Sequence, residues 1–288
     1  MRLRIVALGV GVALVSVSLA AQRPTPDKIP AAAGGDITII PISHGTVEIV
    51  QGPRVVLVDP ARSMTDPRFD APPPPGRGAA AQPPPPAPVP PPGAATRALY
   101  KGLATPTLIL VTDIHEDHFD PEVIKMVSGP ATVVVGPSVV SSKFPGAGWL
   151  ANGQSKVVDG ITLEAVPMYN LRVEPGMDEP FHTKGRGNGY IVTIGGTRLY
   201  FGGDTACTPE INALKNIDIA FLPMNLPFTM SAADAVECAK AFRPKIAYPY
   251  HYLGPDAGGP AAFEKALQGS GIEVRLRDWY VGLPSMGK

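Results

Sequence analysis

Four potential metal ligands lie within six residues of the chain, at Asp113, His115, Asp117 and His118. Imidazole and carboxylate groups together suit Zn²⁺ and the neighbouring first-row ions. The two histidines are too close in sequence to share one helical face, but a loop can turn alternate side chains toward two adjacent ions. Taken alone, this run could also be an ordinary solvated polar loop, because short motifs have real false-positive rates.

The elements around this run indicate how its side chains are positioned. Residues 107–111 form an apolar, β-branched run that predicts a buried strand ending just before Asp113. A second apolar run ends before Gly203 and Asp204, and a third ends at His251. Proteins built from α and β layers place their sites at the carboxyl ends of strands. All three runs therefore carry candidate ligands where such a site is expected.

In these motifs and their order, the chain resembles the metallo-β-lactamase superfamily. Members carry a His-x-His-x-Asp-His loop, a later His, a Gly-Asp-Thr turn and a C-terminal His. The resemblance covers roughly His44 to the C-terminus, with one insertion, and is closest to the branch of ascorbate-6-phosphate lactonase-like hydrolases. It implies an α+β fold, a four-layer αββα sandwich of two mixed sheets with helices outside.

The alternation of short strands and modest helices agrees with that fold and not with a doubly wound parallel sheet. Apolar periodicity and first-turn prolines predict helices over residues 121–126, 209–214, 231–242 and 260–267.

The resemblance implies two metal positions. At the second, Asp117, His118 and His251 match the family, and Asp204 is the expected bridge between the ions. At the first, His115 is kept, but Asp113 stands where the family has its first His. Asn170 stands where the isolated middle His is usually found. An amide oxygen is a weak, neutral ligand, so the first position should bind more loosely or favour a harder ion than zinc.

A glycine-rich, basic loop precedes the strand expected at residues 190–194. His182, within this loop, could supply the missing imidazole or contact an anionic substrate, and it could also be an exposed histidine without a role. Such loops often handle substrates. We place His182 on the substrate side, together with Lys184, Arg186 and Tyr190.

Two further residues are candidates at the edge of the site. His44 lies in a turn between two short strands, where the resembling branch often has a histidine, and we expect it to contact substrate. Asp59 ends the run at residues 55–58 and could accept the free N–H of a metal-bound imidazole. A hairpin histidine and an Asp-Pro turn are the alternatives.

The chain begins with a predicted signal peptide over residues 1–21, in which Arg2 and Arg4 precede a nearly continuous apolar run and a small-residue cleavage site. An uncleaved anchor is the alternative. We expect an exported protein, periplasmic or secreted, with no stable membrane span after the leader is removed. Residues 22–35 are expected to be flexible, and residues 36–288 to form one domain.

Proline is abundant, at 35 residues, and much of it is concentrated in an insertion over residues 72–93. This composition predicts polyproline II or disorder. The 25 basic residues balance the 25 acidic ones, which argues against a nucleic-acid partner. The two cysteines, Cys207 and Cys238, do not make a disulfide-rich scaffold, and whether they meet is left open.

These features favour a metal-dependent hydrolase acting on a small, conceivably anionic, ester, lactone, amide or phosphodiester. One or two Zn²⁺ ions are the expected cofactors, with Mn²⁺ or Fe as alternatives, and Asp117 is the expected catalytic residue that orients the nucleophile. Two other functions stay open. One is a non-catalytic binding or scaffold protein with a degenerate metal site, and the other is a di-iron redox relative.

Overall fold

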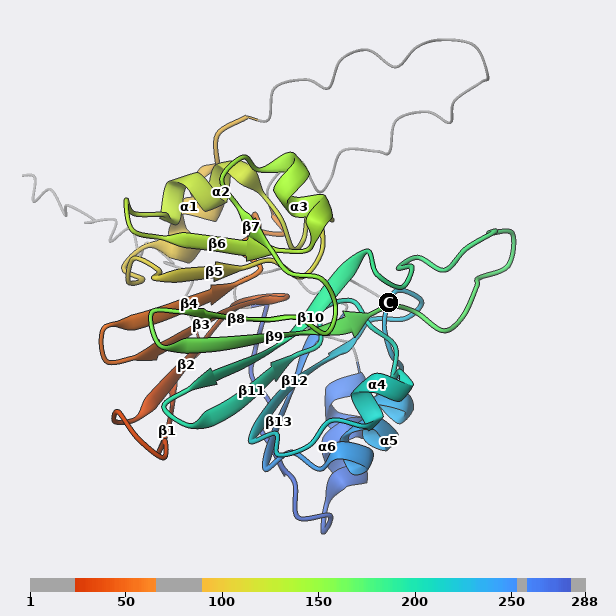
Figure 1. The fold of residues 1–288 in the computed structure, drawn as a ribbon. Coiled ribbons are helices and arrows are strands. Elements are labelled where there is room, and N and C mark those ends of the chain that lie inside the picture. The colour runs from red at the N-terminus through yellow and green to blue at the C-terminus, as the bar shows by residue number, and fades with distance from the viewer. Residues whose placement is uncertain (1–23, 66–89, 253–257, 281–288) are drawn as a thin grey trace, which may run out of the picture.

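The computed structural model describes residues 24–65, 90–252 and 258–280, whose strands form two seven-stranded sheets (Figure 1). The first sheet has the spatial order β1 (Asp27–Ile29), β2 (Ile37–Ser43), β3 (Thr46–Gln51), β4 (Arg54–Val58), β5 (Leu108–Leu110), β6 (Val133–Gly136) and β7 (Gly148–Trp149). The second has the order β14 (Glu273–Val274), β13 (Ile246–Tyr252), β12 (Ile219–Met224), β11 (Thr197–Phe201), β10 (Gly187–Ile194), β9 (Ile161–Met168) and β8 (Ser155–Val158). Both sheets are mixed, because hairpin pairs are followed by parallel pairs at β4–β5 and at β11–β12–β13.

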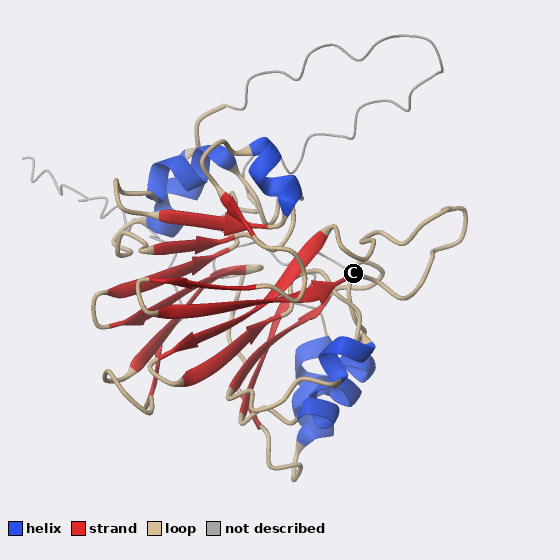
Figure 2. Ribbon diagram, in the orientation of Figure 1, coloured by secondary structure: helices blue, strands red, loops and turns tan. Residues whose placement is uncertain are grey.

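Helices cover the outer face of each sheet (Figure 2). The first sheet carries α1 (Ala94–Tyr100), α2 (Pro121–Val127) and α3 (Ser138–Lys143), and the second carries α4 (Pro209–Asn212), α5 (Ala232–Phe242) and α6 (Gly259–Leu267). Buried side chains of both sheets, among them Val58, Leu110, Val192 and Phe221, form one continuous core between them. The predicted four-layer αββα sandwich is confirmed.

The four predicted helices are present, and local chemistry explains their starts. Ser231 and Asp234 form a capping box at α5, and the Asp120 side chain accepts from two backbone N–H groups at the start of α2. Helices α1 and α3 were not predicted. Each is seven residues or shorter, and neither has the first-turn proline that marks the equally short α2 and α4.

Residues 24–35 correct the expectation of a flexible N-terminal segment. Strand β1 pairs with β2, and Ile29 is buried in the core. Farther along, the Ala33 carbonyl accepts a hydrogen bond of 2.8 Å from the Gln51 side chain. The segment is rich in proline, alanine and glycine, but its residues Asp27–Ile29 form the edge strand of the first sheet.

Two other expectations fall mostly outside the described residues: the signal peptide, and the proline-rich insertion up to residue 89. At the return of that insertion, the carbonyls of Pro90 and Pro91 accept hydrogen bonds from the buried Arg62 side chain, the latter at 3.3 Å. In the described part of the chain, no helix has the length and apolarity to cross a membrane. Cys207 and Cys238 do meet, as a disulfide with a Cα–Cα distance of 5.5 Å that ties the segment after β11 to α5.

The parallel strands bring four carboxyl ends to one edge of the sandwich. Asp59 follows β4, residues 113–118 follow β5, Asp204 follows β11, and His251 lies near the end of β13. The two sheets together therefore position the candidate ligands.

Candidate metal centre

Seven imidazole and carboxylate side chains gather at this edge in two groups. The second position, as defined by the structure, is Asp117, His118, Asp204 and His251; the first position is Asp113, His115 and His182. Within each group, one candidate ligand atom per residue lies within 4.8 Å of the others.

Three atoms face one another at the centre of the second position. His118 Nε2 lies 3.0 Å from His251 Nε2, and Asp204 Oδ1 lies 3.2 Å from each of them. Asp117 Oδ2 lies 3.3 Å from His251 Nε2. The side chains of His118, His251 and Asp204 are at most 4 % exposed, whereas that of Asp117 is 29 % exposed. Asp117 therefore marks the open side of this position.

A buried network orients His118. Its Nδ1 lies 2.8 Å from Asp59 Oδ2, which directs Nε2 toward Asp204 and His251. Asp59 itself accepts from the Thr112 backbone N–H and hydroxyl, both at 2.7 Å. Burial raises the pKa of Asp59, against the opposing effect of His118. The contact is the one expected of Asp59, an acceptor for the second ring nitrogen of a candidate ligand.

Asp204 joins the two positions. While its Oδ1 faces His118 and His251, its Oδ2 lies 3.2 Å from His182 Nε2. Gly203, at φ 62°, makes the turn before it, and a Cβ there would lie 2.6 Å from Met168 Sδ. A side chain at 203 would therefore displace the bridging carboxylate.

The first position differs from the expected one. His115 Nδ1 lies 2.9 Å from Asp113 Oδ2 and 3.1 Å from His182 Nε2. His182 is 1 % exposed, so it is neither a surface histidine nor free to contact substrate. The earlier assignment of His182 to the substrate side is corrected, because its ring occupies the corner of the missing imidazole.

The expectation that Asn170 is a ligand of the first position is corrected as well. Its Oδ1 accepts from the backbone N–H of His182 and lies 2.8 Å from His182 Nδ1, while its Nδ2 donates to the Phe228 carbonyl at 2.8 Å. These contacts use the amide oxygen that a metal would need. Asn170 thus orients His182 as Asp59 orients His118.

The three residues that were placed on the substrate side together with His182 lie in different places. Arg186 is at the centre, with Nη2 2.9 Å from Asp113 Oδ2 and 2.6 Å from His115 Nε2. Lys184 is exposed and paired with Glu210, away from both positions. Tyr190 is fully buried in the core, where its hydroxyl accepts from Asn188, so the structure contradicts a substrate contact.

His44 lies behind Asp117 and not on the open side. Its Nε2 is 3.3 Å from Asp117 Oδ2, and its Nδ1 is 2.6 Å from the Tyr280 hydroxyl. Burial, together with nearby His251, lowers the pKa of His44 to about 4. The imidazole is therefore neutral at pH 7, and the expected contact with substrate is replaced by a contact with a candidate ligand.

The electrostatics of the centre favour a cation. Burial alone would lower the pKa of His118, but Asp204, Asp117 and Asp59 raise it well above its usual value. Burial would likewise raise the pKa of Asp204, but His251 and His118 hold it far below the usual range. Among the described residues, the buried Oδ1 atoms of Asp113 and Asp204 accept no hydrogen bond. Because buried polar atoms normally have partners, this donor set fits a bound metal ion.

Three of the six non-glycine residues with positive φ in the described part of the chain lie around the second position. His44, Asp59 and His251 have φ values of 50°, 47° and 48°. Left-handed backbone is uncommon for residues other than glycine, and it tends to be retained at functional sites.

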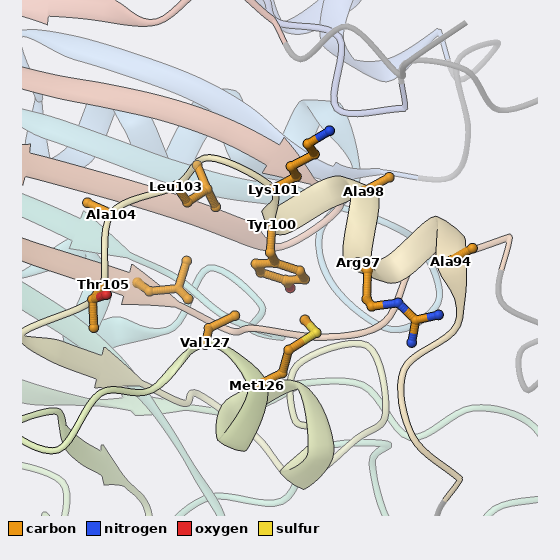
Figure 3. A pocket seen from close by; sticks show the side chains of 11 residues that line it. Ala94, Arg97, Ala98, Tyr100, Lys101, Leu103, Ala104, Thr105, Met126 and Val127 are labelled. Atoms are coloured by element: carbon orange, nitrogen blue, oxygen red, sulfur yellow. The ribbon is translucent and has the colours of Figure 1, made fainter. Parts of the chain in front are cut away.

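Two cavities formed by the described residues have walls made of side chains other than the seven of the cluster. One of about 600 Å³ lies between α1 and α2 on the outer face of the first sheet, where Tyr100 and Met126 face it (Figure 3). Another, of about 320 Å³, adjoins the centre, because Asn170 is in its wall together with Leu171, Leu226 and Met230.

Sequence reasoning missed two polar contributors, Thr112 and Tyr280. Thr112 immediately follows a strand, a position that offered a weak signal. Tyr280 lies 236 residues from His44, and no local pattern links the two.

Comparison with known proteins gives consistent similarities. Residues 38–251 match the family described as the beta-lactamase superfamily domain. A UPF0173 metal-dependent hydrolase of Deinococcus radiodurans is 37% identical over 98 residues, which cover 33% of this chain and 43% of that protein. One from Symbiobacterium thermophilum is 32% identical over 171 residues, covering 54% of this chain and 73% of that protein. A crystal structure from Parabacteroides distasonis ATCC 8503, named for a metal-dependent hydrolase, shares 33% identity with a TM-score of 0.70 and covers 88% of this chain and 99% of that one.

Proposed function

Because the chain belongs to the beta-lactamase superfamily and has its fold, we propose that it is a metal-dependent hydrolase that uses both positions of the centre. The observation that carries this proposal is Asp204, whose two oxygens face different groups of imidazoles, each at 3.2 Å. A carboxylate in this arrangement can bridge two ions. The donor set of imidazole and carboxylate suits Zn²⁺, and the excess of carboxylate also suits Mn²⁺ or Fe.

In this proposal, His118, His251 and Asp117 hold the second ion, and His115, His182 and Asp113 hold the first. When bound, such an ion lowers the pKa of a water molecule toward 7 and thus provides hydroxide at neutral pH. Asp117, 29 % exposed on the open side, orients that nucleophile through its carboxylate. The buried imidazoles keep bulk water from the other sides.

Substrate enters from the side of His115, Asp117 and Arg186, whose side chains are 43 %, 29 % and 25 % exposed. This partial exposure favours a catalytic centre over a closed structural one, which would leave no open position. Arg186 Nη2 can donate to a substrate oxygen that becomes negative during attack, once it turns from Asp113. Lys184 is tied to Glu210 and contributes no such donor.

The substrate that fits best has a hydrolysable carbonyl or phosphoryl group and an apolar arm. Large apolar side chains are exposed on the two loops beside the centre, at Leu171, Val173, Met177, Leu226 and Phe228. The Asn170 amide binds one of these loops through the Phe228 carbonyl. The finer resemblance to ascorbate-6-phosphate lactonase-like hydrolases stays a prediction.

The test is metal analysis followed by a panel of lactones, β-lactams, thioesters, aryl esters and phosphodiesters, each with short and long apolar arms. Wild-type protein loaded with Zn²⁺ or Mn²⁺ should hydrolyse at least one class, and Asp117→Ala should reduce kcat by roughly 100-fold or more, the scale expected when a reacting group is misplaced. The exposed Asp178→Ala is the control and should behave as wild type. Turnover unchanged in Asp117→Ala would contradict the assignment of that residue.

We also propose that the protein is exported and that its leader is removed after Ala20 or Ala21. The disulfide supports this proposal, because structural disulfides persist in oxidising compartments. N-terminal sequencing of protein from its native cells is the test, and an intact Met1 would contradict it.

A further inference from the structure

The His44 side chain connects two distant parts of the protein within the buried interior. One ring nitrogen contacts Asp117, in the loop after β5, at 3.3 Å. The other contacts the hydroxyl of Tyr280, beyond β14, at 2.6 Å. His44 is 5 % exposed and Tyr280 is 2 % exposed, so water does not compete for the contact between them, whereas Asp117 is 29 % exposed.

The chemistry of the three groups sets the direction of both hydrogen bonds. An ionised carboxylate only accepts, a tyrosine hydroxyl can donate or accept, and a neutral imidazole has one N–H and one lone pair. Both contacts are satisfied only if Tyr280 donates to Nδ1 and Nε2–H donates to Asp117 Oδ2. The opposite tautomer would direct an imidazole lone pair at a carboxylate.

The backbone turn at His44 does not depend on this side chain. The His44 N–H donates to the Trp279 carbonyl at 3.3 Å, and its carbonyl accepts from the His251 N–H at 3.2 Å. These two bonds hold the left-handed backbone at φ 50°. A residue that tolerates positive φ, asparagine above all, would suffice for the turn. The imidazole therefore needs another explanation.

We propose that His44 is a positioning residue for Asp117, and that Tyr280 sets the tautomer that allows it. Asp117 lies on the open side of the centre, where a carboxylate would otherwise be free to rotate. His44 contacts Oδ2, the same oxygen that lies 3.3 Å from His251 Nε2, and so holds that oxygen toward the second position. This proposal rests on the proposed function, since it takes Asp117 to be a metal ligand.

Two substitutions separate positioning from turn formation. Glutamine extends an amide N–H to roughly the place of Nε2 and can still donate to Asp117. Asparagine offers an acceptor near Nδ1 and suits positive φ, but it is too short to reach Asp117. If His44 only forms the turn, His44→Asn should bind Zn²⁺ more tightly than His44→Gln. If His44 positions Asp117, His44→Gln should bind Zn²⁺ more tightly than His44→Asn.

The experiment is titration of the full-length apo protein with Zn²⁺ against a chromophoric chelator, with melting temperatures of the apo forms measured in parallel. We expect His44→Asn to weaken binding at the second position by 10- to 100-fold, the usual effect of losing a partner of a metal ligand. His44→Gln should recover most of this loss, although its apo form should melt no higher than His44→Asn. Tyr280→Phe should show a smaller loss than His44→Asn.

The proposal would be overturned if His44→Asn bound Zn²⁺ with wild-type affinity. It would also be overturned if His44→Gln bound Zn²⁺ no more tightly than His44→Asn. Wild-type affinity in Tyr280→Phe would overturn the role of the hydroxyl. Failure of the proposed function looks different, because wild-type protein would then bind no Zn²⁺, or would bind it unchanged in His118→Ala.

Discussion

Single residues behind the ligands determine which atoms face the centre. Asp59 lies 2.8 Å from Nδ1 of His118, and Asn170 lies 2.8 Å from Nδ1 of His182, so both rings turn Nε2 toward Asp204. Metal-binding histidines commonly donate their second N–H to a carboxylate or carbonyl. The Asp59 carboxylate behind His118 and the Asn170 amide behind His182 thus both orient an imidazole ring.

Replacing Asp59 by asparagine should weaken the second position without changing the turn. Asparagine tolerates the left-handed backbone at φ 47°, but it has one acceptor oxygen where Asp59 uses two. We expect the Zn²⁺ dissociation constant to rise about tenfold, as measured by chelator competition. Asp178→Asn, on an exposed loop, is the matched control. An unchanged constant in Asp59→Asn would show that His118 needs no such partner.

The depressed pKa of His44 should make the metal-free protein sensitive to moderate acid. In the unfolded chain a histidine titrates near 6.5, whereas in the folded protein the pKa of His44 is about 4. As pH falls, the unfolded state takes up the proton first, so stability is lost between about pH 6.5 and 4. Relative to His44→Asn, wild type should lose on the order of 3 kcal/mol of unfolding free energy over that window. Denaturant titrations at several pH values would measure it, and parallel curves for the two proteins would contradict it.

The family resemblance predicted which residues approach one another at the second position, and strong apolar strands lead to all four of them. It failed at the first position for a physical reason. His182 lies 12 residues beyond Asn170 in a polar loop, and nothing in its spacing shows that the loop folds back. The same limit applies to Tyr280, whose contact with His44 depends on the tertiary fold.

Strands and their ends determine the architecture around the centre. The core strands were readable because their residues are apolar and β-branched, whereas β1, β7 and β8 are short or polar and were not predicted. The disulfide was beyond sequence reasoning, since Cys207 and Cys238 are 31 residues apart with no indication of pairing. It links the segment after Asp204 to α5, and so stabilises the element that presents the bridging carboxylate.

Loss of the disulfide should lower the thermal stability of the metal-free protein. Closing a loop of 31 residues restricts the unfolded chain, which corresponds to about 3 to 4 kcal/mol in the chain-entropy view. The Cys207→Ser, Cys238→Ser double variant should therefore melt roughly 6 to 12 °C lower than wild type in the apo form. Scanning calorimetry with and without dithiothreitol would measure this, and wild type in dithiothreitol should approach the variant. A melting temperature equal to that of oxidised wild type would show that the bridge contributes nothing.

The molecule as a whole is a two-sheet sandwich into which a proline-rich insertion has been placed between β4 and α1. In the chain the insertion separates two elements of the layers around the first sheet, whose β4 and β5 form part of the centre. The carbonyls of Pro90 and Pro91 bind Arg62, which also donates to Asp120 at 2.5 Å, at the start of α2. The return of the insertion is therefore part of the packed structure.

Two linker replacements should show which part of the proline-rich segment contributes to stability, the insertion itself or its return at residues 90–92. Replacing residues 72–88 by a short Gly-Ser linker should leave the melting temperature within about 2 °C, because that segment has few apolar side chains to bury. Extending the replacement to residues 72–92 should lower it further. The backbone at 90–92 can still accept hydrogen bonds, but a Gly-Ser chain must lose more conformational entropy than proline to make them. Thermal melts of both variants would decide, and equal melting temperatures would show that Pro90 and Pro91 add no stability.

Metal stoichiometry tests the central claim most directly, since Asp204 is proposed to join two ions and His182, not Asn170, is proposed to complete the first position. Elemental analysis of protein loaded with Zn²⁺ and then desalted should give two ions per wild-type chain, one for His182→Ala, and two for both Asn170→His and the control Asp178→Ala. Two ions in His182→Ala, or no ion in wild type, would contradict the account.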